Sequence, residues 1–290
     1  MELDLSQLEP LWALHGLQLK RTLTGFGSQG VYHIQATEGE FIFKWHDPSL
    51  DVARLHAELT LVDALPARGF HHTPRLRKAV NGELWGRLTG GVGYLYHFVP
   101  GDTPAPTPEH YAQLGQLTVT LHQVSGSFHP LAWTIQDIVG HIIQDRAPLT
   151  PAIFRTEYVA LAQRLPALDH LPKALIHGDL ALVNVIKSPD GMFTVVDWEG
   201  CGWGVRLFDL AYLFFQWLSD DLSFAYTSAQ AFFHAYLARQ PLTAEEWRAL
   251  PDLSLLLPLN FILFGDTALK WQKILWLHQH RAEILRSVMA

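Results

Sequence analysis

The chain contains 290 residues, of which 49% are hydrophobic and 17% are charged, and its formal net charge is −7 at pH 7. This length can form two domains with cores of their own, and the apolar content excludes a disordered chain. The negative net charge and the scattered basic residues argue against a nucleic-acid partner.

The sequence shows little sign of a signal peptide, a membrane-spanning segment or a disulfide. The first four residues include the acidic Glu2 and Asp4 and no basic residue, whereas a signal peptide begins with basic residues. The longest apolar stretch, residues 253–264, is too short to span a bilayer and contains Pro258 and Asn260. Cys201 is the single cysteine, so no intramolecular disulfide can form, which suits a reducing compartment. We therefore expect a cytoplasmic protein without a membrane partner, and its oligomeric state stays open.

A glycine-rich pattern, G-x-G-x-x-G, lies between two runs of β-forming residues near the start of the chain. Its members are Gly25, Gly27, Ser28 and Gly30. Glycines let backbone N–H groups approach phosphates closely, although the same pattern occurs in dinucleotide sites and in ordinary turns. Residues 31–34 read as a strand and not as the start of a helix. This favours a glycine-rich hairpin that covers nucleotide phosphates.

The next strand and helix carry a lysine and a glutamate. Lys44 stands alone among apolar residues in the predicted strand 41–45, as in the kinase strand that binds phosphate. Glu58 lies in a segment, 52–62, whose apolar residues recur with helical spacing, and it could reach Lys44. Taken singly, Lys44 could instead extend to solvent and Glu58 could be a surface charge.

A domain boundary follows the predicted strand 93–99. Residues 100–108 are rich in proline and polar turn residues, and Pro108 marks the start of a helix. The sequence therefore predicts two domains, at residues 1–99 and 100–290.

The segment from His177 to Asp197 sets three oxygen-bearing side chains at a spacing that suits phosphoryl transfer. Asp179 follows a predicted strand at 173–176 and could orient a substrate hydroxyl. The amide oxygen of Asn184 and the carboxylate of Asp197 are hard ligands of the kind that Mg²⁺ prefers. A hairpin between them could bring the two together. Alone, these residues fit an ordinary turn followed by a hairpin equally well.

These motifs, in this order, resemble the aminoglycoside phosphotransferase and choline kinase-like superfamily, relatives of the eukaryotic protein kinases. The resemblance covers residues 23–212. It implies an α+β fold with two protein-kinase-like lobes. The N-lobe, residues 1–99, would have an antiparallel sheet and one helix and bind nucleotide, and the C-lobe, residues 100–290, would be mainly helical, carry catalysis and bind the acceptor substrate. The chain departs from the family at Ala181, Leu182 and Val183, where members often carry His-Pro-Gly or similar residues.

The resemblance also implies roles for residues. Asp179 becomes the catalytic base, and Asn184 and Asp197 become Mg²⁺ ligands. Lys44 contacts the α- and β-phosphates of ATP, or of GTP, and Glu58 holds Lys44.

Further roles follow from the same resemblance. The strand containing Tyr96 and Phe98 would line the adenine site, although its residues fit a plain strand edge equally well. His177 would brace the catalytic loop, and Asp209 would be structural. His122 matches a family position that we interpret as packing.

The chemical class of the phosphoryl acceptor is predicted from the charge of the second lobe. Residues 1–99 hold 10 acidic and 9 basic side chains, whereas residues 100–290 hold 18 acidic and 12 basic ones. An acidic second lobe favours a cationic acceptor, and Glu199, two positions after Asp197, is the best candidate to face it. Tryptophans after Asp197 could contact a sugar or an ammonium. We therefore expect a small amine-bearing molecule with a hydroxyl, such as an aminoglycoside, an amino alcohol or a hydroxy amino acid.

Two other classes stay open. A protein kinase is disfavoured because only 11 residues separate Asp197 from Asp209 and no Ala-Pro-Glu motif occurs. A non-catalytic nucleotide-binding module is disfavoured because every catalytic group is present.

Overall fold

The chain divides into two compact units. The computed structural model describes residues 4–23, 30–126, 131–132, 134–135, 152–256 and 267–289. Unit 1 comprises Met1–Asp102 and Ile186–Glu199, and unit 2 comprises Thr103–Val185 and Gly200–Ala290. The sequence-based boundary lay after residue 99 and left residues 186–199 in the second domain, whereas the structure groups this segment with unit 1.

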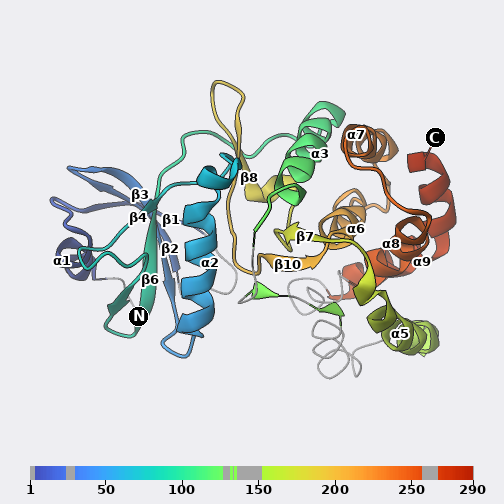
Figure 1. The fold of residues 1–290 in the computed structure, drawn as a ribbon, viewed down its shortest axis with the longest axis horizontal. Helices are drawn as coiled ribbons and strands as arrows, with labels where there is room; N and C mark the ends of the chain where they lie inside the picture. The colour runs from blue at the N-terminus through green and yellow to red at the C-terminus, as the bar shows by residue number, and fades with distance from the viewer. Residues whose placement is uncertain are drawn as a thin grey trace. The chain divides into compact units, whose positions relative to one another are not determined.

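Unit 1 is built on an antiparallel sheet with the strand order β1-β2-β3-β6-β4, and β5 pairs with β6 (Figure 1). The strands are β1 (Gln18–Leu23), β2 (Gly30–Ala36), β3 (Gly39–His46), β4 (Leu76–Arg77), β5 (Gly86–Leu88) and β6 (Gly91–His97). The helical segments are η1 (Leu5–Gln7), α1 (Leu8–Trp12), α2 (Val52–Ala64) and η2 (Pro66–Arg68). Helix α2 begins where the Asp51 side chain accepts hydrogen bonds from the amides of Ala53 and Arg54.

The two faces of the sheet differ in character because side chains alternate along a strand. One face packs against α1 to form an apolar core. Its members are Leu8, Trp12, Leu14, Tyr32, Ile34, Ala36, Phe41, Phe43, Trp45, Ala79 and Leu95. Lys44 and His46 alternate with Phe43 and Trp45 on β3, so they project from the opposite face, along which α2 runs (Figure 1).

A short hairpin is attached to unit 1 by backbone hydrogen bonds. Its strands are β8 (Val185–Lys187) and β9 (Phe193–Val195), which pair with each other. The Val195 amide donates to the carbonyl of His72 at 2.8 Å, and the Lys187 amide donates to the carbonyl of Asp102 at 2.8 Å. These contacts explain why residues 186–199 group with the sheet rather than with the helices.

Unit 2 is mainly helical. Its helices are α3 (Pro108–His122), α5 (Ala152–Arg164), α6 (Leu207–Gln216), α7 (Tyr226–Leu237), α8 (Ala244–Leu256) and α9 (Thr267–Met289). Its other elements are η5 (Leu165–His170), η6 (Leu182–Asn184) and the antiparallel pair β7 (Lys173–Ile176) and β10 (Gly202–Val205). Helix α3 begins at the predicted Pro108, where the hydroxyl of Thr107 caps it.

Helices α3 and α7 pack closely because α3 carries a glycine at their contact. A Cβ atom at Gly115 would lie 2.5 Å from the carbonyl oxygen of Phe232, so a larger residue would push the helices apart. Aromatic rings fill the space around α6 and α7, with Trp217 in edge or tilted contact with Tyr111, Phe214 and Phe233. Of the six tryptophans after Asp197, Trp198, Trp217 and Trp271 are buried, and Trp203, Trp247 and Trp276 are half-buried.

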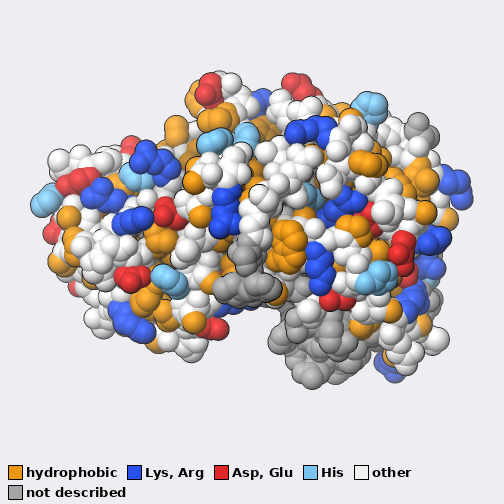
Figure 2. All heavy atoms as spheres, in the orientation of Figure 1, with side chains coloured by type: hydrophobic (Ala, Val, Ile, Leu, Met, Phe, Trp, Pro, Cys, Tyr) orange, Lys and Arg blue, Asp and Glu red, His pale blue; other side chains and the backbone are white. Residues whose placement is uncertain are grey.

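The predicted fold class is confirmed: an α+β chain with an N-terminal antiparallel sheet and a mainly helical C-terminal part. In the described portion of the chain, no helix is both long and apolar enough to cross a membrane. Of the apolar stretch at residues 253–264, only 253–256 lie within the described residues, at the end of α8. On the face shown in Figure 2, basic and acidic side chains are interspersed with hydrophobic ones.

Candidate active site

A buried lysine forms the centre of a polar cluster in unit 1. Lys44 lies opposite Tyr94 in the β3–β6 ladder, and 12% of its side chain is exposed. Its Nζ donates hydrogen bonds to Asp197 Oδ1 at 2.6 Å and to Glu199 Oε1 at 2.8 Å. Burial disfavours the charged ammonium, but the carboxylates of Glu199 and Asp197 outweigh this effect and raise the pKa of Lys44. The lysine therefore stays cationic.

Glu199 is held by two aromatic side chains as well as by the lysine. Its Oε1 accepts a hydrogen bond from the Tyr94 hydroxyl at 2.8 Å, and His46 Nε2 lies 3.4 Å from the same oxygen. Burial alone would raise the pKa of this carboxyl, but His46 and the Lys44 cation lower the pKa of Glu199 to about 2. Burial and the Glu199 charge raise the pKa of the Tyr94 phenol, which remains a donor.

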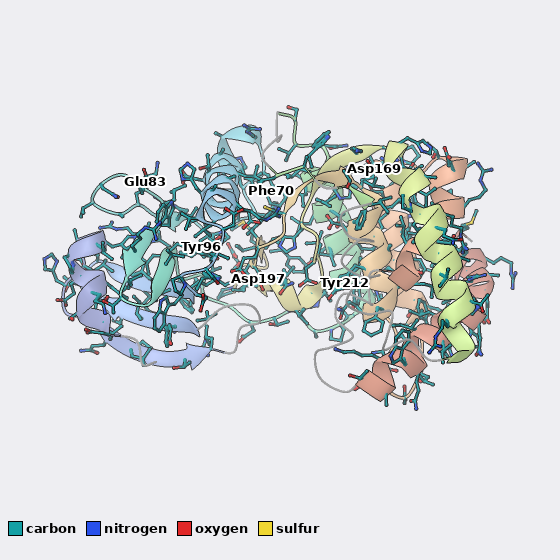
Figure 3. All side chains as sticks on the ribbon, turned by 90° about the horizontal axis from the view of Figure 1, so that it is seen from below. Phe70, Glu83, Tyr96, Asp169, Asp197 and Tyr212 are labelled. Carbon is teal, nitrogen blue, oxygen red and sulfur yellow. The ribbon has the colours of Figure 1, made fainter. Side chains whose placement is uncertain are left out.

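The segment that carries both carboxylates is fixed by the residue between them. Trp198 is buried, its Nε1 donates to the Val195 carbonyl at 2.9 Å, and its ring meets Phe70 edge-on at 5.8 Å. Figure 3 labels Phe70 and Asp197, which belong to the same unit. Asp197 has a φ of +65°, a left-handed conformation that aspartate adopts more readily than most residues. Such backbone outliers cluster at functional sites, where surrounding contacts hold them.

Glu199 and Asp197 take the place beside Lys44 that the sequence assigned to Glu58. Glu58 lies on α2 and is buried, and its carboxylate accepts a hydrogen bond from Arg54 Nε at 2.9 Å, one helical turn away. Glu199 was expected to face the acceptor, yet its Oε1 is engaged by Lys44 and Tyr94. The sequence pointed to Glu58 for Lys44, whereas the contact of Glu199 joins residues 155 positions apart and left no local pattern.

The predicted phosphate-binding glycines are described only in part. Gly25, Gly27 and Ser28 lie outside the described residues. Gly30 begins β2, and the space that a Cβ atom would occupy there is filled by the ring of Tyr32. A larger residue at Gly30 would therefore have to displace that ring.

The residues predicted to line the adenine site lie on β6 and just beyond it. Tyr96 is buried between β3 and β4, with which its backbone is paired. The Phe98 amide donates to the Glu40 carbonyl at 2.9 Å, and its ring stacks on His33 at 4.2 Å. The Phe98 amide is therefore already used and does not serve a base that binds at this edge.

In unit 2, a buried aspartate holds the loop that follows β7. Asp209, on the first turn of α6, accepts hydrogen bonds from the amides of His177 at 2.9 Å and Gly178 at 2.8 Å. Gly178 has a φ of +85°, and a Cβ atom there would lie 2.9 Å from the carbonyl of Gly200. Only glycine fits such a turn without strain. The loop is therefore fixed at its backbone just before Asp179.

Asn184 fixes the same loop from its far end. Its Nδ2 donates to the Asp179 carbonyl at 2.8 Å and to Asp179 Oδ2 at 2.9 Å. Both partners are acceptors, so the amide nitrogen must face them and the amide oxygen must point elsewhere. Burial, and then the charge of Asp179, raise the pKa of the Tyr212 phenol on α6. Asp179 is thus presented as an oriented carboxylate.

One member of this network was missed in the sequence. His122 on α3 was interpreted as packing, but its Nε2 lies 3.1 Å from Asp209 Oδ2 and its Nδ1 lies 2.9 Å from the Tyr236 hydroxyl. Both His122 and Asp209 have fully buried side chains. Because a carboxylate only accepts, Nε2 carries the proton and donates it to Asp209. The signal available in the sequence was a histidine inside an otherwise apolar helix face.

The predicted metal ligands have the donor atoms that a hard cation requires. Asp197 already binds a cation, the Lys44 ammonium, and 41% of its side chain is exposed. Asn184 keeps its amide oxygen as an acceptor. Asp197 belongs to unit 1 and Asn184 to unit 2, and each is described within its own unit. Across the residues described, no group of three or more His, Cys, Asp or Glu side chains could hold a metal. Mg²⁺ does not need one, because waters and phosphates complete its shell.

Comparison with known proteins identifies the relatives of this chain. Residues 21–253 match the model of the family described as "Phosphotransferase enzyme family" (APH). A homoserine kinase of Acidiphilium cryptum (strain JF-5) is 26% identical over 266 residues, covering 86% of this chain and 82% of the relative.

Solved structures share the whole fold. An aminoglycoside phosphotransferase from Alicyclobacillus acidocaldarius superposes with a TM-score of 0.71 at 16% identity, covering 100% of this chain and 96% of that chain. An amicoumacin kinase in complex with AMP-PNP and Ca²⁺ superposes with a TM-score of 0.69 at 16% identity, covering 97% of this chain and 92% of that chain. The fold is therefore the one found in these small-molecule kinases.

Proposed function

The chain belongs to the phosphotransferase enzyme family, and from this premise we propose that it transfers the γ-phosphoryl group of ATP to a hydroxyl of a small amine-bearing molecule. The family and the homoserine kinase relatives make it a small-molecule kinase rather than a protein kinase or a non-catalytic module. The observation that carries the proposal is the oriented Asp179, whose loop is held by Asp209 and whose carboxylate is held by Asn184.

In this proposal Asp179 acts on the acceptor. Its carboxylate accepts the proton of the acceptor hydroxyl as that oxygen bonds to the γ-phosphorus and ADP leaves. Little covalent chemistry falls to the protein in such a transfer, so catalysis depends on position and charge. The hydrogen bond from Asn184 suits this role because it orients the carboxylate.

Protein side chains and a metal ion would together neutralise the negative charge of the phosphates. We assign Lys44 to the phosphates, and Asn184 and Asp197 to Mg²⁺. When bound, the ion would neutralise charge on the transferring phosphoryl group. ATP with a divalent cation is supported by the family and by the neighbour that holds AMP-PNP and Ca²⁺. A comparison of kcat/KM for ATP with kcat/KM for GTP shows which of the two nucleotides is the preferred phosphoryl donor.

The adenine base would bind at the edge beyond β6, near Tyr96 and Phe98. The Phe98 amide is already used by Glu40. Among the described residues, no hydrogen bond engages the amide of Val99, the next along the chain, and we assign that donor to the base. Pro100 follows and has no amide hydrogen.

The acceptor that we favour is a small amino alcohol or hydroxy amino acid of the size of homoserine. Homoserine carries an amine and a primary hydroxyl, and a homoserine kinase matches 86% of this chain. The excess of acidic residues in 100–290, 18 against 12 basic ones, favours a positively charged group. An aminoglycoside is the second candidate, based on the solved structure with the TM-score of 0.71.

Matched acceptor pairs test this proposal. ADP release is measured with homoserine against 4-hydroxybutyrate, with aminopropanol against propanol, with an aminoglycoside, and with a protein mixture. We expect at least a tenfold higher kcat/KM for the amine member of a pair, about 1.4 kcal/mol. Equal turnover of neutral acceptors would remove the amine requirement, and turnover of the protein mixture alone would contradict a small-molecule kinase.

A further inference from the structure

A buried hydrogen bond crosses the interface between helices α3 and α7, which pack against each other in unit 2 (Figure 1). His122 Nδ1 on α3 lies 2.9 Å from the Tyr236 hydroxyl on α7, and the two rings meet edge to face at 5.7 Å. Gly115, about two helical turns before His122, lets the helices approach this closely. Tyr236 is fully buried, so water does not compete for its hydroxyl.

The same histidine links α7 to the loop that precedes Asp179. His122 Nε2 donates to Asp209 Oδ2 at 3.1 Å, and this carboxylate accepts from two amides of the loop, at 2.9 and 2.8 Å. Because Nε2 carries the proton, Nδ1 of the neutral ring is an acceptor, and the Tyr236 hydroxyl donates to it. Burial raises the pKa of the Tyr236 phenol, so the hydroxyl keeps this proton. The hydrogen bonds therefore run in one direction, from α7 to the loop backbone.

We propose that Tyr236 is a positioning residue for the catalytic loop: its hydroxyl fixes the ring of His122, which orients the Asp209 carboxylate that holds the loop. This inference rests on the proposed function, in which Asp179 receives the proton of the acceptor. A ring held at one nitrogen can turn about its Cβ–Cγ bond, whereas a ring held at both nitrogens has one orientation. The loop position matters because proton transfer requires the Asp179 carboxylate within hydrogen-bond reach of the acceptor hydroxyl.

Tyr236→Phe removes the hydroxyl and keeps the ring, which also stacks on Phe232 with 6.2 Å between centroids. We expect kcat to fall about fivefold, within the range of one neutral hydrogen bond, with KM for ATP within about twofold of wild type. The matched control is Tyr111→Phe. Tyr111 is also buried, packs its ring edge-on against Trp217, and takes no part in this chain of hydrogen bonds. Its loss should leave kcat unchanged, and an equal fall in both variants would overturn the proposal.

A double-mutant cycle separates action through His122 from an independent effect of Tyr236. His122→Phe removes both ring nitrogens and interrupts the hydrogen bonds in the middle, so kcat should fall about tenfold. Adding Tyr236→Phe to this variant should lower kcat by less than about 1.5-fold more, because the hydroxyl no longer has a ring nitrogen to fix. A further fivefold fall in the double variant would show that Tyr236 acts independently of His122 and would overturn the proposal.

Hydrogen exchange of the loop amides needs neither turnover nor a folded His122 variant. The amides of His177 and Gly178 donate to Asp209 in the wild type. Relative to the amides of the β7–β10 pair, they should exchange at least about threefold faster in Tyr236→Phe and at the wild-type rate in Tyr111→Phe. Unchanged relative exchange in Tyr236→Phe overturns the positioning role. If wild-type protein phosphorylates none of the acceptors, the proposed function fails, while this comparison still decides whether Tyr236 holds the loop.

Discussion

Replacing Glu199 with glutamine should destabilise unit 1 in a way that depends on pH. In the folded chain the pKa of this carboxyl is lowered from 4.5 to about 2. A shift of about 2.5 units is worth about 3 kcal/mol at neutral pH, since one unit equals about 1.36 kcal/mol. This is an upper limit, because 28% of the side chain is exposed and the His46 contact is 3.4 Å long. Because the pKa is lowered, the stabilisation is complete above pH 4.5 and is lost as the pH falls toward 2.

Urea unfolding of the nucleotide-free chain, followed by tryptophan fluorescence, measures this difference. Between about pH 7 and about pH 3, the gap in unfolding free energy between wild type and Glu199→Gln should shrink by up to about 2 kcal/mol. Tyr94→Phe removes one neutral donor to Glu199 and should cost about 1 kcal/mol. A gap that is the same at both pH values would refute the ion-pair reasoning.

The same variants decide which glutamate serves Lys44 in catalysis. Glu199→Gln should raise KM for ATP about tenfold, because the lysine loses one of the two carboxylates that orient it. Glu58→Gln should change KM for ATP less than threefold, since the Glu58 carboxylate is engaged by Arg54. The opposite order of effects would restore the assignment based on sequence.

The remaining predictions concern single side chains. Asp179→Asn should lower kcat by about 10²-fold or more while nucleotide affinity stays within a few-fold, as measured by steady-state kinetics and calorimetry. Asp197→Ala should weaken MgATP binding in a titration, and Asn184→Ala should do so more mildly because it removes a neutral ligand. Unchanged MgATP affinity in Asp197→Ala would place the metal elsewhere. Glu246→Gln should destabilise the fold by about 3 kcal/mol in urea, since it leaves the cation of Arg206 buried without its bidentate partner. A loss under about 1 kcal/mol would show that water reaches that pair.

Local patterns were sufficient to predict much of the fold. Strand β7 occupies Lys173–Ile176 as predicted, because an apolar run there ends at the His-Gly turn. Helix α3 begins at Pro108, since proline at the first helical position and a capping threonine act within a few residues. The strand that carries Lys44 could be found in the same way, from alternation around a single charged residue.

Contacts between distant residues could not be predicted this way. Lys44 and Glu199 are 155 positions apart, and the choice of Glu199 over Glu58 depends on how Trp198 fixes the segment in unit 1. The grouping of residues 186–199 with the sheet depends on backbone hydrogen bonds to His72 and Asp102. Such bonds do not depend on side-chain identity, so the sequence gives no pattern from which to predict them. His122 looks like one more packing residue of an apolar helix face until its ring is placed beside Asp209.

Each charged group that we assign to the reaction is supported from within its own unit. Lys44 is held by Asp197 and by Glu199, which Tyr94 and His46 support, all in unit 1. The loop that carries Asp179 is held by Asp209 of α6 in unit 2. The supports therefore share no side chain, and substitutions in different networks should act independently on the transition state. Combining Tyr94→Phe with Asp209→Asn should give the sum of the single effects on the logarithm of kcat/KM, within about 0.5 kcal/mol. A coupling energy well above that value would mean that the lysine and the base are positioned by one shared network.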